Sequence, residues 1–258
     1  VGGLFDAEDC YGAWRLYEAI EKQSPATDNR LVFGPWSHGQ WGGANADALG
    51  NILFGSNTAI WYQNNIEIPF FNYHLKGKGS ISNLAEATVF FSGENKWYKL
   101  GEWPPKEKKD QEIFLQPQGG LGWTRPAAST AYTEYTSDPA RPVPYAEDVH
   151  MRRTVQYMTD DQRFASRRPD VTVFETEVLT EDLTLAGTVV ADLLVSTTGT
   201  DVDLVVKVID VFPNDFEYEK KSNYPMGGYQ MLIRGEVMRG KFRNSFEKPE
   251  AFTPNKVA

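Results

Sequence analysis

The spacing of apolar and polar residues changes along this 258-residue chain, and the change falls near residue 80. Before that point, the apolar stretches 1–5 and 30–36 are typical of buried strands, whereas residues 10–23 repeat their apolar side chains at helical spacing. A second helix is expected over 56–77, with Pro69 kinking it or ending its first half. This alternation of strands and helices predicts an α/β fold.

From about residue 80 the apolar residues recur with a period of two. Short alternating or β-branched runs are separated by glycine, proline, asparagine and aspartate, which is typical of an all-β sandwich. The expected strands lie within residues 87–100, 111–118, 171–179, 185–200, 201–213 and 229–238. We therefore predict two domains, an α/β part over residues 1–79 and a β-sandwich over residues 80–258.

Composition excludes several classes of protein. With 41% hydrophobic and 13% aromatic residues, the chain can bury a large core. Its formal net charge of −9 argues against a nucleic-acid partner, which would require clustered lysine and arginine. The lone Cys10 excludes an internal disulfide and any multi-cysteine metal site. Because no stretch reaches the roughly 18 apolar residues of a membrane span, no membrane partner is expected either.

An aspartate and a histidine follow successive strands of the predicted α/β part. Asp6 comes directly after the apolar run 1–5, and His38 comes just after the run 30–36, with Ser37 between them. Because the carboxyl ends of parallel strands meet at one edge of a sheet, we expect the two side chains to lie together. They fit the acid and base of a serine hydrolase, although an aspartate after a strand is often only a helix cap or loop stabiliser. His74 and His150 lack such a partner and are interpreted as structural.

Three carboxylates, Asp6, Glu8 and Asp9, lie within the four residues DAED. Neighbouring acids disfavour one another's ionisation, so some compensating interaction is expected. One possibility is that Glu8 and Asp9 cap the following helix and complement its dipole.

Several longer motifs resemble one enzyme group. They are GLFDAED, GPWSHG, FFNYHLKG, FSGENKWYKLGEWPP, YTSDPARPVPY and FETEVLTEDLTLAGTVVADLLVST. Together they resemble the serine hydrolases grouped with cocaine esterase and the X-Pro dipeptidyl peptidases, and within that group the α-amino-acid ester hydrolases. The resemblance covers almost the whole chain. It implies that residues 1–79 are the C-terminal part of an α/β-hydrolase domain and that residues 80–258 form a jelly-roll-like β-sandwich.

The resemblance also implies a role for each candidate site residue. Asp6 and His38 match the acid and base of the catalytic triad, and Glu8 and Asp9 match carboxylates that receive the substrate's α-ammonium group. The implied partner is a small-molecule ester or amide of an α-amino acid. No metal or organic cofactor is implied. A homo-oligomer is possible, and a periplasmic or secreted location is favoured over a cytoplasmic one.

The nucleophile of this group lies on a G-x-S-Y-x-G turn, and no G-x-S-x-G occurs in the 258 residues. We therefore expect the chain to be a fragment of a longer enzyme, without nucleophile or oxyanion hole. On its own it should be inactive, and its β-domain is expected to be truncated at the C-terminus.

Other functions stay open. An X-Pro dipeptidyl peptidase also binds a free amino terminus, so the acidic cluster fits it too. A glutaryl-cephalosporin acylase binds an anionic acyl group, for which such a cluster is unsuitable. A non-catalytic β-sandwich that binds carbohydrate is an alternative from another class, with Trp97, Trp103 and Trp123 as its platform.

Overall fold

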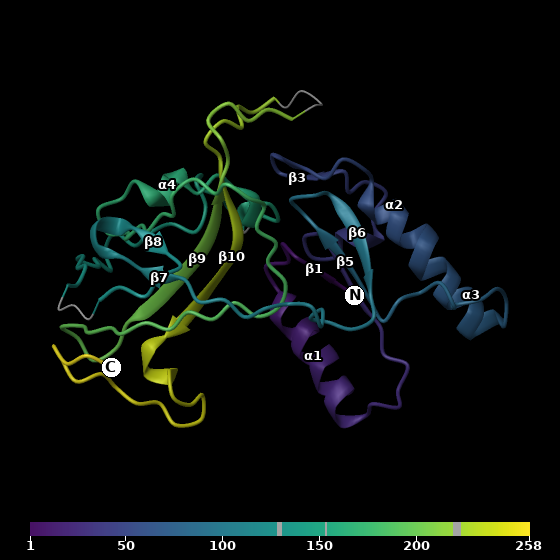
Figure 1. The fold of residues 1–258 in the computed structure, drawn as a ribbon, viewed down its shortest axis with the longest axis horizontal. Coiled ribbons are helices and arrows are strands. Elements are labelled where there is room, and N and C mark those ends of the chain that lie inside the picture. Colours follow the sequence, from purple (N-terminus) through teal and green to yellow (C-terminus); the bar gives the residue numbers. More distant parts are fainter. Residues whose placement is uncertain (128–130, 153, 219–222) are drawn as a thin grey trace.

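The computed structural model describes residues 1–127, 131–152, 154–218 and 223–258, and its elements gather in two groups (Figure 1). The α-helices are α1 (Cys10–Gln23), α2 (Thr58–Tyr62), α3 (Ile68–Lys76) and α4 (Arg163–Ser166). The strands of the first group are β1 (Gly2–Gly3), β2 (Leu31–Gly34), β3 (Ala48–Leu49), β4 (Ile52–Leu53), β5 (Ala87–Phe91) and β6 (Lys96–Leu100). Those of the second group are β7 (Phe114–Leu115), β8 (Leu121–Gly122), β9 (Asp203–Val211) and β10 (Gln230–Arg239).

A four-stranded sheet in the order β1-β2-β5-β6 organises the first group. Strands β1, β2 and β5 are parallel, and β6 returns antiparallel to β5. Helix α1 packs on one face, where Tyr17 joins Phe33, and α2 packs on the other, where Tyr62 joins Val32. Neighbouring residues of β2 point to opposite sides of the sheet, so the two helices contact different residues of the same strand. The strand–helix–strand order predicted for this part is confirmed.

Hydrogen bonding in this sheet crosses the predicted domain division. Strand β5, which the residue pattern assigns to the β-sandwich, pairs with β2 through Ala87 and Leu31. Four of its five residues are buried, so it needs cover on both faces, and a parallel sheet between helices provides that. The division at residue 79 stays a prediction.

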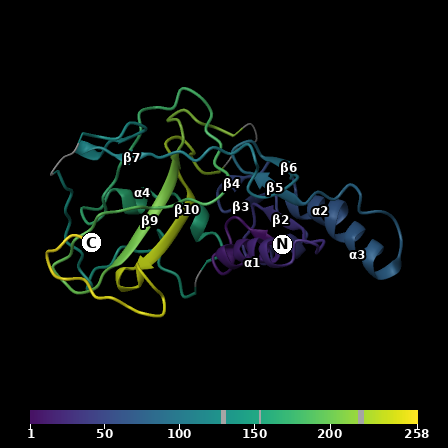
Figure 2. The same cartoon turned by 60° about the horizontal axis from the view of Figure 1, so that its bottom comes forward.

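The second predicted helix is divided into three pieces. Helix α2 is followed by a π-helical stretch, Gln63–Glu67, and then by α3, in which Pro69 occupies the first turn. The residues at the junctions, Tyr62, Gln63, Glu67 and Ile68, all keep right-handed helical dihedrals, so Pro69 lies inside one continuous helical run and its missing N–H removes an intrahelical hydrogen bond there. In Figure 2, α2 and α3 extend away from the rest of the molecule. Among the described helices, none is long and apolar enough to cross a bilayer.

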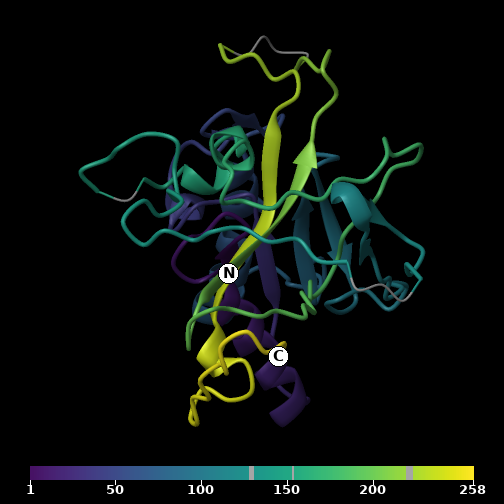
Figure 3. The same cartoon turned by 90° about the vertical axis from the view of Figure 1, so that its left-hand side faces the viewer.

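The second group is centred on the long antiparallel ribbon of β9 and β10 (Figure 3). The strands expected over 171–179 and 185–200 are not formed, although all of these residues are described; the first makes one isolated bridge, from Glu175 to Gly120. Apolar residues there are exposed, with Val178 at 91% and Leu194 at 86%. Without a facing layer these segments run extended outside any regular ladder, and a closed sandwich is not seen in the described residues.

One hydrophobic core joins the two groups. Phe5 and Phe90 from the first pack with Tyr229 and Met231 from the second. The start of β10 therefore packs against the segment that follows β1. The buried members of this core are Phe5, Leu49, Ile52, Phe54, Phe90, Met158, Met226, Tyr229, Met231 and Leu232.

Candidate active site

Asp6 lies in the turn after β1 and is only 4% exposed. Its Oδ1 accepts the backbone N–H of Glu8 at 2.8 Å and that of Asp9 at 3.1 Å. These two donors stabilise a buried carboxylate, because hydrogen bonds to the charged form offset its loss of hydration. They also fix the direction of the second oxygen, Oδ2.

The turn that carries Asp6 is tied to the end of β2. The N–H of Phe5 donates to the carbonyl of Trp36 at 3.1 Å. A Cβ on Gly3 would lie 2.2 Å from that same carbonyl oxygen, so only glycine allows the two segments to approach this closely. Asp6 and His38 therefore follow two neighbouring strands, and the distance between these strands depends on Gly3.

His38 faces Asp6 as the strand order predicts. Its Nδ1 lies 2.9 Å from Asp6 Oδ2, and the aspartate side chain is 2% exposed whereas the histidine side chain is 52% exposed. The hydrogen bond to Asp6 and the charge of Asp6 raise the pKa of His38, with smaller contributions from Glu8 and Asp9. The predicted approach of the two residues is confirmed by this geometry.

This contact determines which ring nitrogen can act as a base. When Asp6 accepts a hydrogen bond from Nδ1, the neutral imidazole keeps its lone pair on Nε2. Nε2 lies on the outer side of the ring, away from the buried acid. The pair Asp6–His38 can therefore accept a proton from a group outside it and stabilise the resulting cation.

Three side chains that the residue pattern did not single out hold the loop around His38. Gln40 accepts the N–H of Ser37 at 3.1 Å through its Oε1 and donates to the carbonyl of Ala48 at 3.1 Å through its Nε2. The fully buried Trp36 donates to Thr58 at 2.9 Å, and Trp41 lies edge-on to the His38 ring at 6.1 Å. The sequence signal for them is the run of aromatic and amide residues around GPWSHGQW.

Glu8 and Asp9 lie on the exposed side of the site. Asp9 occupies the N-cap position of α1. All residues of this helix are described, and none of its N–H groups donates a capping hydrogen bond to the Asp9 carboxylate. Glu8 Oε2 lies 3.9 Å from His38 Nε2. Of the three predicted carboxylates, Asp6 and Glu8 lie against the imidazole, and Asp9 acts on it only through its charge. In the described residues no group of three or more histidine, cysteine, aspartate or glutamate side chains is arranged to hold a metal ion.

The three tryptophans proposed as a carbohydrate platform are separated by their packing. Trp97 stacks on Trp61 at 4.4 Å, and Trp103 stacks on Trp14 at 4.9 Å, both within the first group of elements. Trp123 is 47% exposed. Two of the three therefore contribute to internal packing.

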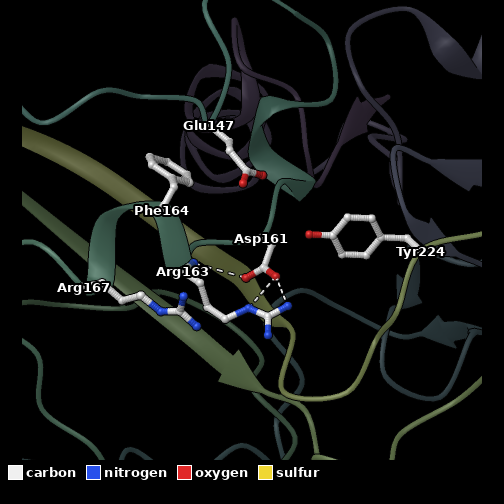
Figure 4. Close-up of a pocket in the computed structure, with 6 residues that line it drawn as sticks. All are labelled: Glu147, Asp161, Arg163, Phe164, Arg167 and Tyr224. Carbon is white, nitrogen blue, oxygen red and sulfur yellow. Dashed lines mark hydrogen bonds and ion pairs between the residues drawn. The ribbon is translucent and has the colours of Figure 1, made fainter.

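A second polar cluster surrounds a cavity of about 380 Å³ in the second group (Figure 4). Asp161, 4% exposed, accepts the N–H of Arg163 and that of Gln230 through Oδ1 and the Arg163 side chain through Oδ2. That bond raises the pKa of Arg163, and the Tyr224 hydroxyl points toward the pair. The cavity lining is Glu147, Asp161, Arg163, Phe164, Arg167 and Tyr224. Sequence reasoning did not identify this cluster.

Most of the chain matches a known protein family. Residues 80–258 match the family described as the X-Pro dipeptidyl-peptidase C-terminal non-catalytic domain. A cocaine esterase from Rhodococcus sp. (strain MB1 Bresler) is 32% identical over 209 residues, which cover 78% of this chain and 36% of that protein.

Two solved structures are similar over nearly the whole chain. An aminopeptidase from a marine sediment archaeon, Thaumarchaeota archaeon, matches with a TM-score of 0.91 and 37% identity, covering 100% of this chain and 42% of the other. An α-amino acid ester hydrolase matches with a TM-score of 0.86 and 35% identity, covering 99% and 43%. The chain therefore spans less than half the length of these relatives.

Proposed function

Because the chain belongs to the cocaine esterase and X-Pro dipeptidyl peptidase group, with residues 80–258 in the C-terminal non-catalytic domain family, we propose that it is part of a serine hydrolase of α-amino-acid esters and amides. Hydrolysis is the activity class of its relatives. The serine that acts as nucleophile is proposed to lie outside the 258 residues, since none of them forms a G-x-S-x-G turn. The fold proposed for the whole is an α/β-hydrolase domain followed by a jelly-roll-like domain.

The hydrogen bond between Asp6 and His38 carries this proposal. His38 Nε2 accepts the proton of the serine hydroxyl as the serine attacks the substrate carbonyl, and then returns it to the leaving alcohol or amine. Asp6 holds the tautomer with the proton on Nδ1 and stabilises the imidazolium ion. Water then attacks the acyl-enzyme, again with His38 as the base.

Glu8 and Asp9 support the choice of substrate. Two exposed carboxylates beside the base can receive an α-ammonium group, whose nitrogen is two bonds away from the carbonyl carbon under attack. Charge-assisted hydrogen bonds of this kind are shorter and stronger than neutral ones. The same cation would offset the mutual repulsion of the three acids.

An aminopeptidase is a second candidate. The amino terminus of a peptide presents the same ammonium group next to a carbonyl, and one of the similar structures is an aminopeptidase. Turnover of amino-acid esters compared with that of short peptides by the same preparation would distinguish the two candidates.

The substrate proposal is tested in a protein that joins this chain to its nucleophile-bearing part. Glu8→Gln with Asp9→Asn should lower kcat/KM for an α-amino ester by roughly 30-fold, because a bound substrate excludes water from its pairs with these carboxylates, and removing a partner from a desolvated charge pair costs roughly 2–5 kcal/mol. The matching des-amino ester should lose little. Glu18→Gln, an exposed carboxylate on α1 paired with Arg15, is the control and should change neither rate. Equal losses on both esters would rule out an ammonium-binding role.

A further inference from the structure

A carboxylate side chain lies near each of the two ring nitrogens of His38. Asp6 Oδ2 lies 2.9 Å from Nδ1, and Glu8 Oε2 lies 3.9 Å from Nε2. The two acids differ in exposure, because the side chain of Asp6 is 2% exposed and that of Glu8 is 48% exposed. Glu8 therefore faces the nitrogen that must accept a proton, from a position open to an incoming ligand.

We propose that Glu8 holds the Nε2 side of His38 in the resting site and releases it when the α-ammonium group of a substrate arrives. This inference rests on the proposed function and adds a second role to a residue already assigned to the substrate. Glu8 becomes a specificity-determining residue that acts through the base as well as through binding.

The charges around the ring support this coupling. In the described part of the chain, the charged side chains that act most strongly on the imidazole are Asp6, Glu8 and Asp9, and all three are acidic. They favour the protonated ring, which cannot act as a base. The aromatic neighbour, Trp41, carries no charge to oppose them.

An ammonium group changes this balance in two ways. It takes Glu8 as its own ion-pair partner, so that the attraction between Glu8 and the imidazolium weakens. It also adds a positive charge close to the ring, which disfavours a second one. The proton on Nε2 then leaves to water, and the lone pair becomes available when a cationic substrate is bound. A des-amino substrate leaves the resting contact in place.

Asp9 provides a matched control within the same turn. Its Oδ1 lies 2.1 Å from the position that a Cβ on Gly12 would occupy, so this carboxylate lies over the first turn of α1. Its charge is the weakest of the three influences on His38. Asp9→Asn removes the same charge from the same turn without removing the contact at Nε2.

The experiment is an NMR titration of the imidazole protons in the 258-residue chain. The chain holds three histidines, and His38→Gln identifies the signal of His38. We expect Glu8→Gln to lower the pKa of His38 by about half a pH unit, the size of an exposed ion pair. Asp9→Asn should lower it less, and Glu8→Asp, whose carboxylate is one methylene shorter, should give an intermediate value.

The ligand arm uses phenylglycinamide, with phenylacetamide as the des-amino control. Saturating phenylglycinamide should lower the pKa of His38 in the unmodified chain and lower it by less in Glu8→Gln, where only the charge of the ammonium group acts on the ring. An unchanged pKa in Glu8→Gln without ligand overturns the inference. If phenylglycinamide shifts the amide signals of Glu8 and Asp9 without moving the pKa, the ammonium site stands and the coupling fails. If it shifts no signal near the site, the ammonium group does not bind beside Glu8 in this chain and the coupling fails, while the ammonium-binding role is decided by the two ester rates of the joined protein.

Discussion

Two buried aspartates, one in each group of elements, share the same hydrogen-bond pattern but have different partners. Asp6 and Asp161 are both 4% exposed. Each accepts two backbone N–H groups through Oδ1 and a cationic or titratable side chain through Oδ2. Burial and hydrogen bonding of the acid alone therefore do not distinguish a pair that can transfer a proton from one that cannot.

The partner of each aspartate makes the difference. His38 is half exposed, can lose its proton, and presents its second nitrogen away from the acid. Arg163 is 29% exposed and stays charged at all ordinary pH values, so its pair with Asp161 holds the chain and moves no proton. Asp161 also binds the N–H of Gln230, the first residue of β10, and so fastens α4 to the ribbon.

The largest expected difference between the two clusters is in catalysis. In a protein that joins this chain to the proposed nucleophile-bearing part, Asp6→Asn should lower kcat by about 10⁴-fold, because an amide would donate to Nδ1 and leave the proton on Nε2. Oδ1 would still accept the N–H groups of Glu8 and Asp9, so the unfolding midpoint should change little. Asp161→Asn should leave kcat near that of the unmodified enzyme. A similar loss of kcat in both variants would show that the clusters are not functionally distinct.

Stability should respond in the opposite order. Asp161→Ala leaves the Arg163 guanidinium and the Gln230 N–H without their acceptor, which should cost about 2–3 kcal/mol of unfolding free energy. Urea unfolding of the 258-residue chain measures this loss. Asp203→Ala is the control, because Asp203 pairs with Arg239 at 2.7 and 2.9 Å with both side chains about half exposed, and its loss should cost about 1 kcal/mol or less. Equal losses would mean that burial of Asp161 adds nothing.

The smallest expected effect is on the pH dependence of stability. Folding raises the pKa of His38, so the folded state binds its proton more tightly than the unfolded chain does. This contribution is complete below the unfolded pKa of about 6.5 and is lost as the pH rises through the higher folded pKa. The difference in urea midpoint between the unmodified chain and His38→Gln should therefore be larger at about pH 5.5 than at about pH 9. A difference that is constant with pH would contradict this coupling. Arg163 should add no such dependence, because it does not titrate there.

The local elements of the α/β part were predictable from residue spacing. Residues 10–23 form α1 as their apolar period indicates, and Gly77, with φ of 60°, ends α3. The β-rich part was less predictable. Period-two alternation identified β9 and β10, whereas 171–179 shows the same pattern and makes only one bridge. Alternation describes which side chains share a face, but a ladder also needs a partner strand at the correct distance.

The sequence by itself determined that an acid and a histidine lie together at one edge of the sheet. An acid and a histidine after successive apolar strands predicted the Asp6–His38 pair, because the ends of parallel strands meet whatever their loops contain. Only the tertiary structure decided that Glu8, rather than Asp9, faces Nε2, and that Asp161 fastens Gln230 across 69 residues. Both depend on side-chain directions and on contacts between distant segments, which the spacing of residues along one segment does not contain.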